Sequence, residues 1–130
     1  MGGVTEHDYR AAAEFRAELR RFLRRSEECA RSHGITPRQH VLLLMIAGSE
    51  GGLSTVSALV ERLHLTQSAV TELVQRAEEA GLVARTPSAT DGRVVELRLT
   101  EEGESKLAAV HTSLGPERHQ LREMIERLPD

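Results

Sequence analysis

The sequence predicts a mainly α-helical fold, formally α+β, in which one short β-hairpin follows two closely spaced helices. Three observations support this prediction. Apolar residues recur at helical spacing over most of the chain. Two short amphipathic segments, 54–63 and 66–80, are separated only by His64 and Leu65. After Gly81 the apolar period changes from 3.6 to 2, the period of a half-buried strand.

The composition indicates a small protein whose core is built from aliphatic side chains. Its 130 residues, without Trp, suit one domain or a domain with an appended dimerisation arm. The net charge of −3 neither indicates nor excludes nucleic-acid binding, because a local patch of basic side chains is enough to neutralise phosphates. Cys29 is the single cysteine, no apolar run has the ~20 residues of a membrane span, and no signal-peptide pattern is present. We therefore expect a cytoplasmic protein with no membrane partner and no cofactor.

A long first helix is expected from Thr5 to Ser32, with Gly34 ending it. Its apolar stripe is narrow and lies on an otherwise charged helix: Phe15, Leu19, Phe22 and Leu23. A helix of about 25 residues with such a stripe is longer than the core of a small domain needs. Packing against a partner helix would use the extra length.

The next three helices are expected from their capping residues. Thr36–Gln39 contains Thr as N-cap, Pro at the first position and Gln closing a capping box. The run Val41–Ile46 that follows is apolar on nearly all sides, so we place this helix at the domain centre. Ser54 is the expected cap of the third helix. Thr66 caps the fourth, and Gly81 is its left-handed C-terminal residue.

A β-hairpin is expected from 82–86 and 93–99, with turn chemistry at Asp91-Gly92. In its second strand three apolar residues alternate with other residues: Val95, Leu97 and Leu99. Thr100 then caps a further helix. Gly115-Pro116 breaks that helix before a last one over 117–128, whose apolar stripe is too narrow to be stable alone.

The exposed face of the fourth helix has an unusual composition for a solvated helix. It carries the amides and hydroxyls of Gln67, Ser68, Thr71 and Gln75. It also carries the charged residues Glu72 and Arg76. Amides and hydroxyls suit hydrogen bonds to base edges and phosphates in a major groove. With the preceding short helix, the spacing is that of a helix-turn-helix. A simple helical hairpin would show the same spacing.

Three stretches of the chain resemble the MarR family of bacterial transcription regulators: ITPRQHVLLLMIA, LSTVSALVERLHLTQSAVTELVQRAEEAGLVAR and DGRVVELRLTEEG. The resemblance covers about residues 35–103. It implies a winged helix-turn-helix DNA-binding domain at 35–100, an N-terminal dimerisation helix at 1–34 and C-terminal dimerisation helices at 101–130. It further implies a homodimeric repressor that binds a pseudo-palindromic operator in double-stranded DNA and responds to a small molecule or a stress signal.

The resemblance also implies which residues contact DNA. The expected set is Ser54, Thr66, Gln67, Ser68, Thr71, Gln75, Arg76, Asp91 and Arg93. Asp91 and Arg93 match a D-x-R motif in the wing, where the carboxylate braces an arginine that enters a narrow minor groove. Glu72 and Gly92 stand where many members carry basic residues. The charge that faces phosphates is therefore lower here.

The resemblance further implies an effector cleft between the dimer helices and the winged helix, and we expect an anionic effector there. Arg38, His40 and Arg85 are the candidates to pair with its carboxylate. For Arg85, a phosphate contact or an ion pair with the hairpin has an equal claim.

Two alternatives stay open. A metal- or redox-sensing regulator would use Cys29 with His33, His40 and His111, because Cys and His are preferred zinc ligands; their spacing is not diagnostic, so we assign no metal site. A winged-helix module that binds protein rather than DNA is favoured by the acidic balance and by three glutamates: Glu72, Glu78 and Glu79. The chain lacks the common catalytic motifs, and we do not expect an enzyme.

Overall fold

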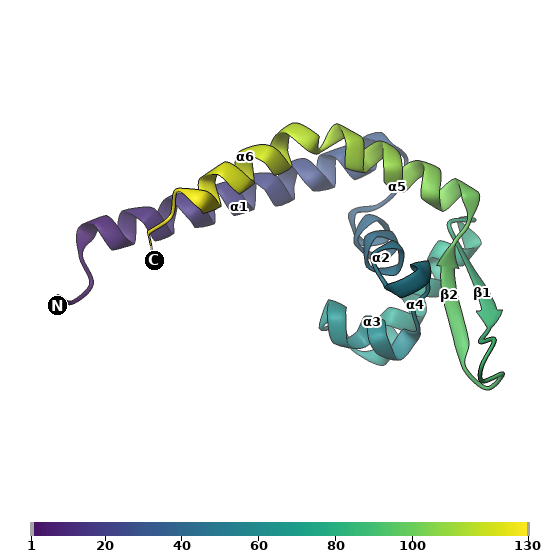
Figure 1. Cartoon of the computed structure of the whole chain (residues 1–130). Coiled ribbons are helices and arrows are strands. Elements are labelled where there is room, and N and C mark those ends of the chain that lie inside the picture. Colours follow the sequence, from purple (N-terminus) through teal and green to yellow (C-terminus); the bar gives the residue numbers. More distant parts are fainter. Residues whose placement is uncertain (1, 130) are drawn as a thin grey trace.

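A computed structural model describes residues 2–129. Its elements are α1 (Glu6–Ser32), α2 (Pro37–Ala47), the 3₁₀ helix η1 (Glu50–Gly52), α3 (Val56–Leu63), α4 (Gln67–Glu79), β1 (Val83–Pro87), β2 (Val95–Leu99), α5 (Glu101–Ser113) and α6 (Gly115–Glu126). The strands form one antiparallel hairpin, which hangs beside the helices (Figure 1). The predicted fold class, mainly helical with one hairpin, is confirmed.

Three helices begin at the threonines that the sequence predicts. The Thr36 hydroxyl accepts a hydrogen bond from the amide of Gln39 at 3.0 Å, and the Gln39 side chain closes the capping box. Thr66 caps α4 at 3.1 Å, and Thr100 caps α5 at 3.0 Å. Each hydroxyl satisfies one of the amides that the first turn of a helix leaves without a partner.

Helix α3 begins differently from the prediction. Its N-cap is Thr55, whose hydroxyl accepts from the amide of Ala58 at 3.2 Å. Ser54 is buried and forms an isolated β-bridge with Leu97, with backbone hydrogen bonds of 3.0 and 2.7 Å. The prediction that Ser54 is the cap is wrong, because its backbone is held by the hairpin.

The core lies where α2, α3, α4, α5 and the hairpin meet. Its largest fully buried side chains are Leu42, Leu43, Ile46, Leu59, Leu97, Val70, Val74 and Val110. One side of α2 stays open, since Val41 and Leu44 are 40% and 41% exposed. The predicted place of α2 at the domain centre is confirmed, because it packs against α1, α3, α4, α5 and β2.

The hairpin is anchored at one end and free at the other. Its register pairs Val83 with Leu99 and Pro87 with Val95. Leu97 is fully buried, whereas Val95 is 44% exposed because the distal half extends beyond the helices (Figure 1). At the anchored end the Thr100 hydroxyl donates to the carbonyl of Gly81 at 2.6 Å, which joins the end of α4 to the start of α5.

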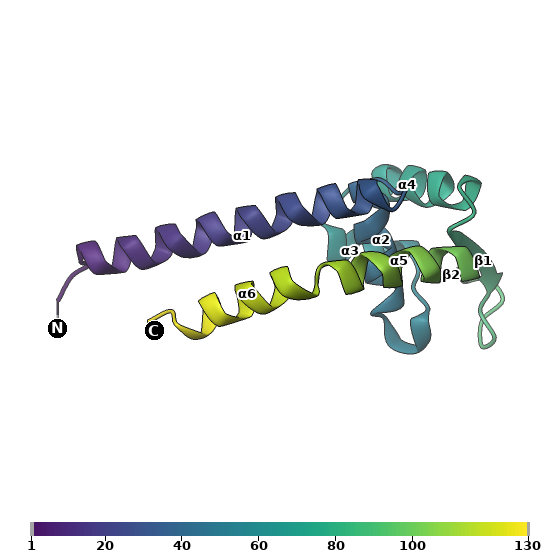
Figure 2. The ribbon, with the colours of Figure 1, turned by 90° about the horizontal axis from the view of Figure 1, so that it is seen from above.

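Helices α1 and α6 form an arm that projects from the rest of the molecule. They run side by side in both views, with the two termini near the same end (Figures 1 and 2). Leu114 alone separates α5 from α6, so the predicted break occurs, although α6 begins two residues earlier than expected. Among the described residues, Ala30 is the only buried one in α1, and α6 has none. No helix within residues 2–129 has the length and apolarity to cross a membrane.

Candidate nucleic-acid interface

A tight turn sets the angle between α3 and α4. His64 ends α3 in the left-handed conformation, with φ of 54°. Positive φ is uncommon for a residue other than glycine. Leu65 then leads directly to the capping residue Thr66. The short connection confirms the predicted helix-turn-helix spacing, but the left-handed residue itself gave no signal in the sequence.

Helix α4 divides sharply into a buried and an exposed face. Val70, Val74 and Ala77 are fully buried against the core. The opposite face is exposed and consists of polar side chains: Gln67, Ser68, Thr71, Glu72, Gln75 and Arg76. The predicted division of the helix is confirmed, and its polar face is free to meet a partner.

Part of this polar face is paired within the helix. Arg76 lies 2.8 Å from Glu72, and the amide of Gln75 lies 3.5 Å from a carboxylate oxygen of Glu79. Both members of the Arg76–Glu72 pair are largely exposed. Such pairs contribute little to stability in water. They can therefore be exchanged for contacts with a ligand at small cost.

The turn of the hairpin is ordered by short polar contacts. The Ser88 hydroxyl accepts from the amide of Asp91 at 3.3 Å. The Asp91 carboxylate in turn accepts from the backbone amide of Arg93 at 3.0 Å and from its guanidinium Nε at 3.4 Å. The brace expected of these residues is present. The Arg93 side chain is 93% exposed, so its guanidinium extends into solvent.

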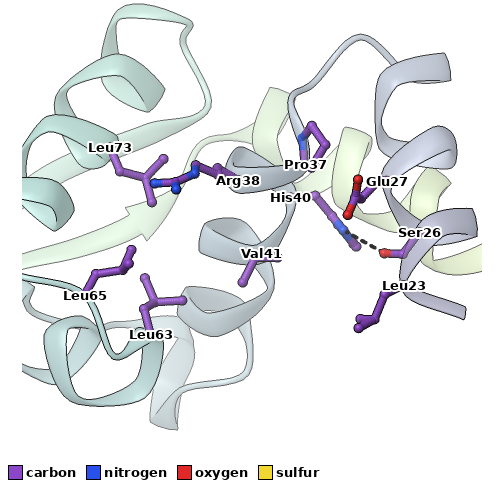
Figure 3. A pocket seen from close by; sticks show the side chains of 10 residues that line it. All are labelled: Leu23, Ser26, Glu27, Pro37, Arg38, His40, Val41, Leu63, Leu65 and Leu73. Atoms are coloured by element: carbon purple, nitrogen blue, oxygen red, sulfur yellow. Dashed lines mark hydrogen bonds between the residues drawn. The ribbon is translucent and has the colours of Figure 1, made fainter. Parts of the chain in front are cut away.

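A cleft of about 320 Å³ opens between α1, α2 and the α3–α4 pair (Figure 3). Its lining is mostly apolar: Leu23, Pro37, Val41, Leu63, Leu65 and Leu73, with Ser26, Glu27, Arg38 and His40 as the polar members. The apolar lining was not recognised as a site from the sequence, because these residues serve equally well as core positions. Arg38 and His40 lie in the cleft as predicted.

Comparison with known proteins shows the family. The MarR family model matches residues 33–94. The repressor MdtR of Bacillus subtilis is 37% identical over 83 residues, which are 64% of this chain and 52% of MdtR. The HTH-type transcriptional regulator YsmB of the same organism is 32% identical over 106 residues, 82% of this chain and 69% of YsmB. The chain belongs to the MarR family. It spans about half the length of MdtR.

Solved structures of this family share the fold. A cysteine-to-serine mutant of MarR from E. coli, in complex with operator DNA, aligns with a TM-score of 0.69 over 98% of this chain and 89% of that one, at 23% identity. The winged helix-turn-helix that the resemblance implied is thus confirmed. The hairpin of this MarR-family chain is the wing, and α4 is the helix in the recognition position.

Of the roles that the sequence left open for Arg85, the structure shows an ion pair and not a position in the cleft. Its guanidinium Nε lies 2.6 Å from the carboxylate of Glu78, at the end of α4, and it does not line the cleft. The ion pair joins β1 to the recognition helix. The expectation that Ser54 contacts DNA is also wrong, because Ser54 is buried and its backbone pairs with Leu97 of β2.

His40 is the buried polar residue of the cleft. Its Nδ1 lies 3.5 Å from the Ser26 hydroxyl on α1, as the dashed line in Figure 3 indicates. Burial lowers the pKa of His40 below its ordinary value of 6.5, because the charged imidazolium loses hydration there. The residue is therefore neutral at pH 7, and it joins α1 to α2 without adding charge to the cleft.

The candidates for metal binding are engaged separately. His33 contacts Ser113, and the Cys29 thiol faces the carbonyl of Val110. His111 contacts Arg118. Among residues 2–129, no three His, Cys, Asp or Glu side chains are placed to share one metal ion. The metal-sensing alternative gains no support from this arrangement.

Proposed function

We propose that this MarR-family protein is a cytoplasmic transcription regulator that binds a pseudo-palindromic operator in duplex DNA as a homodimer, and that it acts as a repressor. The observation that carries the proposal is the exposed amide and hydroxyl face of α4, held beside the wing. The name of MdtR as a transcriptional repressor supports the direction of regulation. The relatives named above are regulators, and none is named as an enzyme.

The proposed contacts follow from the two exposed surfaces. In a major groove, the side chains of Gln67, Ser68, Thr71 and Gln75 on α4 would meet base edges and phosphates. Thr66 would lie beside the backbone at the helix start. Arg93, held by Asp91, would enter the adjacent minor groove, whose negative potential attracts arginine.

The arm supplies the proposed dimer interface. We assign residues 1–34 and 101–130 to dimerisation, and 35–100 to DNA binding. Half-buried side chains line one side of α1, including Phe15 and Phe22, and Ile125 on α6 is 49% exposed. A second copy would cover this apolar surface. The two wings would then lie on neighbouring turns of one duplex, as operator symmetry requires.

The cleft is the proposed effector site. Its volume of about 320 Å³ and apolar walls suit a small organic molecule. Arg38 is the positively charged group in the lining, so an organic anion is the favoured class. Glu27 on the opposite wall disfavours a second negative charge on the ligand.

A second candidate function is protein binding without DNA. Three of the six arginines in 35–100 are paired with carboxylates: Arg76, Arg85 and Arg93. The same segment contains seven acidic residues, so it has no net positive charge. This balance is the specific observation in favour of the alternative.

Salt dependence separates the two candidates. Fluorescence anisotropy would be measured with a duplex from the region upstream of the protein's own gene, against a scrambled duplex, over a range of salt concentrations. Phosphate contacts predict that log K falls linearly with log salt, by about 0.9 for each phosphate neutralised. A flat or absent dependence would support the protein-binding alternative.

A further inference from the structure

Arg38 lies at the boundary between the cleft and the recognition helix. Its side chain lines the cleft and also a smaller hollow against α4, whose other members are Ala69, Glu72, Leu73 and Arg76. Figure 3 shows the guanidinium reaching away from α2 towards Leu73. Leu73 lines both hollows as well, so a single guanidinium borders two separate sites.

The charge of Arg38 is uncompensated, in contrast to that of its neighbour. Arg76 shares the smaller hollow, but Glu72 lies 2.8 Å from it. Within residues 2–129, no carboxylate forms an ion pair with Arg38, and the residue is exposed. Arg38 is therefore the free positive charge on this flank of α4.

The flank of α4 that carries this charge would border the DNA backbone. When a helix occupies the major groove, its outermost face meets base edges, while its sides lie beside the sugar-phosphate strands. Ser68 and Gln75 are exposed and lie opposite the buried residues of α4. Arg38 and Arg76 lie to one side of that face. A guanidinium there can bind a phosphate through charge-assisted hydrogen bonds.

The same guanidinium is the cation available to a ligand in the cleft. The other basic residue of the lining, His40, is buried and neutral at pH 7. Pairing with a carboxylate in the cleft would neutralise Arg38 on the DNA side too. The effect requires no large rearrangement, because the two sites share one charge.

We propose that Arg38 binds a DNA phosphate when the cleft is empty and pairs with an organic anion when the cleft is filled, so that effector and DNA compete for one side chain. This inference rests on the proposed function. It adds Arg38 to the residues that contact DNA. It also explains how an effector would release the DNA, namely by pairing with the positive charge that binds the phosphate.

The test compares wild type, Arg38→Gln, Arg38→Lys and the control Arg10→Gln, an exposed arginine on the arm. Each is titrated with the upstream duplex over a range of salt, alone and with benzoate or the uncharged benzamide of the same shape. Thermal unfolding confirms that each variant is folded. Because the proposed homodimer carries two copies of Arg38, Arg38→Gln is expected to make the salt slope about two units less negative, and Arg38→Lys to restore it.

Benzoate supplies the second half of the test. It is expected to weaken duplex binding several-fold in wild type and in the control variant, but not in Arg38→Gln, while benzamide has no effect. An unchanged slope in Arg38→Gln, equal benzoate sensitivity in all variants, or no benzoate effect on wild type would overturn the inference. In each of these cases wild type still binds DNA; loss of salt-dependent binding by wild type itself would instead refute the proposed function.

Discussion

The winged region and the arm differ in how much of their surface they bury. The winged region encloses a core of fully buried side chains, such as Leu42 and Leu97. In the arm, the first 24 residues of α1 contribute nothing to the buried set, and α6 contributes no residue either. The arm has the amphipathic pattern of a packed helix pair without the corresponding burial.

In the proposed dimer, the two regions obtain their stability from different sources. Burial of apolar surface is the main favourable contribution to folding. The winged region has that contribution within one chain, whereas the arm would gain it only in the proposed dimer, by packing against a second copy. Stability of the arm should therefore depend on protein concentration, and stability of the winged core should not.

The largest expected effect comes from a matched pair of substitutions, Leu42→Ala in the core and Leu121→Ala at a half-buried position of α6 in the arm. Leu42→Ala removes a fully buried side chain and is expected to lower the free energy of unfolding by about 2–5 kcal/mol. Leu121→Ala is expected to weaken self-association more than it destabilises the winged core. Denaturant unfolding at two protein concentrations and sedimentation measure both quantities. Equal, concentration-independent losses would contradict the comparison.

Gly103 tests how α5, the helix that leads to the arm, is held against the wing. An added methyl group there would overlap the carbonyl oxygen of Leu82, where α5 packs on the start of the wing. Gly103→Ala is expected to cost about 1–3 kcal/mol of unfolding free energy, as for other overpacked sites. At the control position Gly115, an added methyl group would meet only the end of the Arg118 side chain, at an ordinary contact distance of 3.9 Å, so Gly115→Ala should be neutral or stabilising, because Ala favours helix. Similar melting temperatures for the two variants would show that the contact is not rigid.

Arg93 tests whether DNA binding belongs to the winged region. Arg93→Ala removes the exposed guanidinium of the wing and is expected to weaken duplex binding by about 1–3 kcal/mol without changing the melting temperature. Arg10→Ala, which breaks a pair of 2.9 Å with Glu6 on the arm, should leave affinity unchanged. Anisotropy titration at fixed salt measures both. Unchanged affinity in Arg93→Ala would refute the minor-groove assignment.

Replacement of His40 is expected to have the smallest effect on stability. This residue contacts Ser26 where α1, the first helix of the arm, meets α2 of the winged region. Since burial lowers its pKa in the folded state, the unfolded chain binds a proton first as pH falls below about 6.5. Wild type should therefore lose stability between about pH 6.5 and the lowered pKa of His40 more steeply than His40→Gln does. Urea unfolding across this range measures the slopes. Parallel curves would show that His40 titrates equally in both states.

Local chemistry made much of the fold predictable from sequence. Thr36, Thr66 and Thr100 cap helices as expected, because each hydroxyl precedes an amphipathic run. Ser54 and Thr55 are adjacent hydroxyl residues, and their order along the chain cannot decide which one caps. The hairpin decides, because it pairs with Ser54 through the backbone.

The candidate site was predictable where it depends on one helix face and less so where it depends on tertiary contacts. The polar face of α4 follows from helical periodicity alone. The partner of Arg85 lies seven residues earlier, on a different element, so the sequence could not exclude the cleft. The cleft is lined by leucines from α1, α3 and α4. No periodic pattern in the sequence reveals that these leucines face the same cavity.

The most direct test of the central claim maps the DNA-binding surface by NMR. Backbone amide resonances of the ¹⁵N-labelled protein would be followed as the upstream duplex is added. We expect the largest shifts in 66–76 of the recognition helix and 88–94 of the wing, with small shifts along α6. Shifts confined to α1 and α6, with the recognition helix unaffected, would contradict the account.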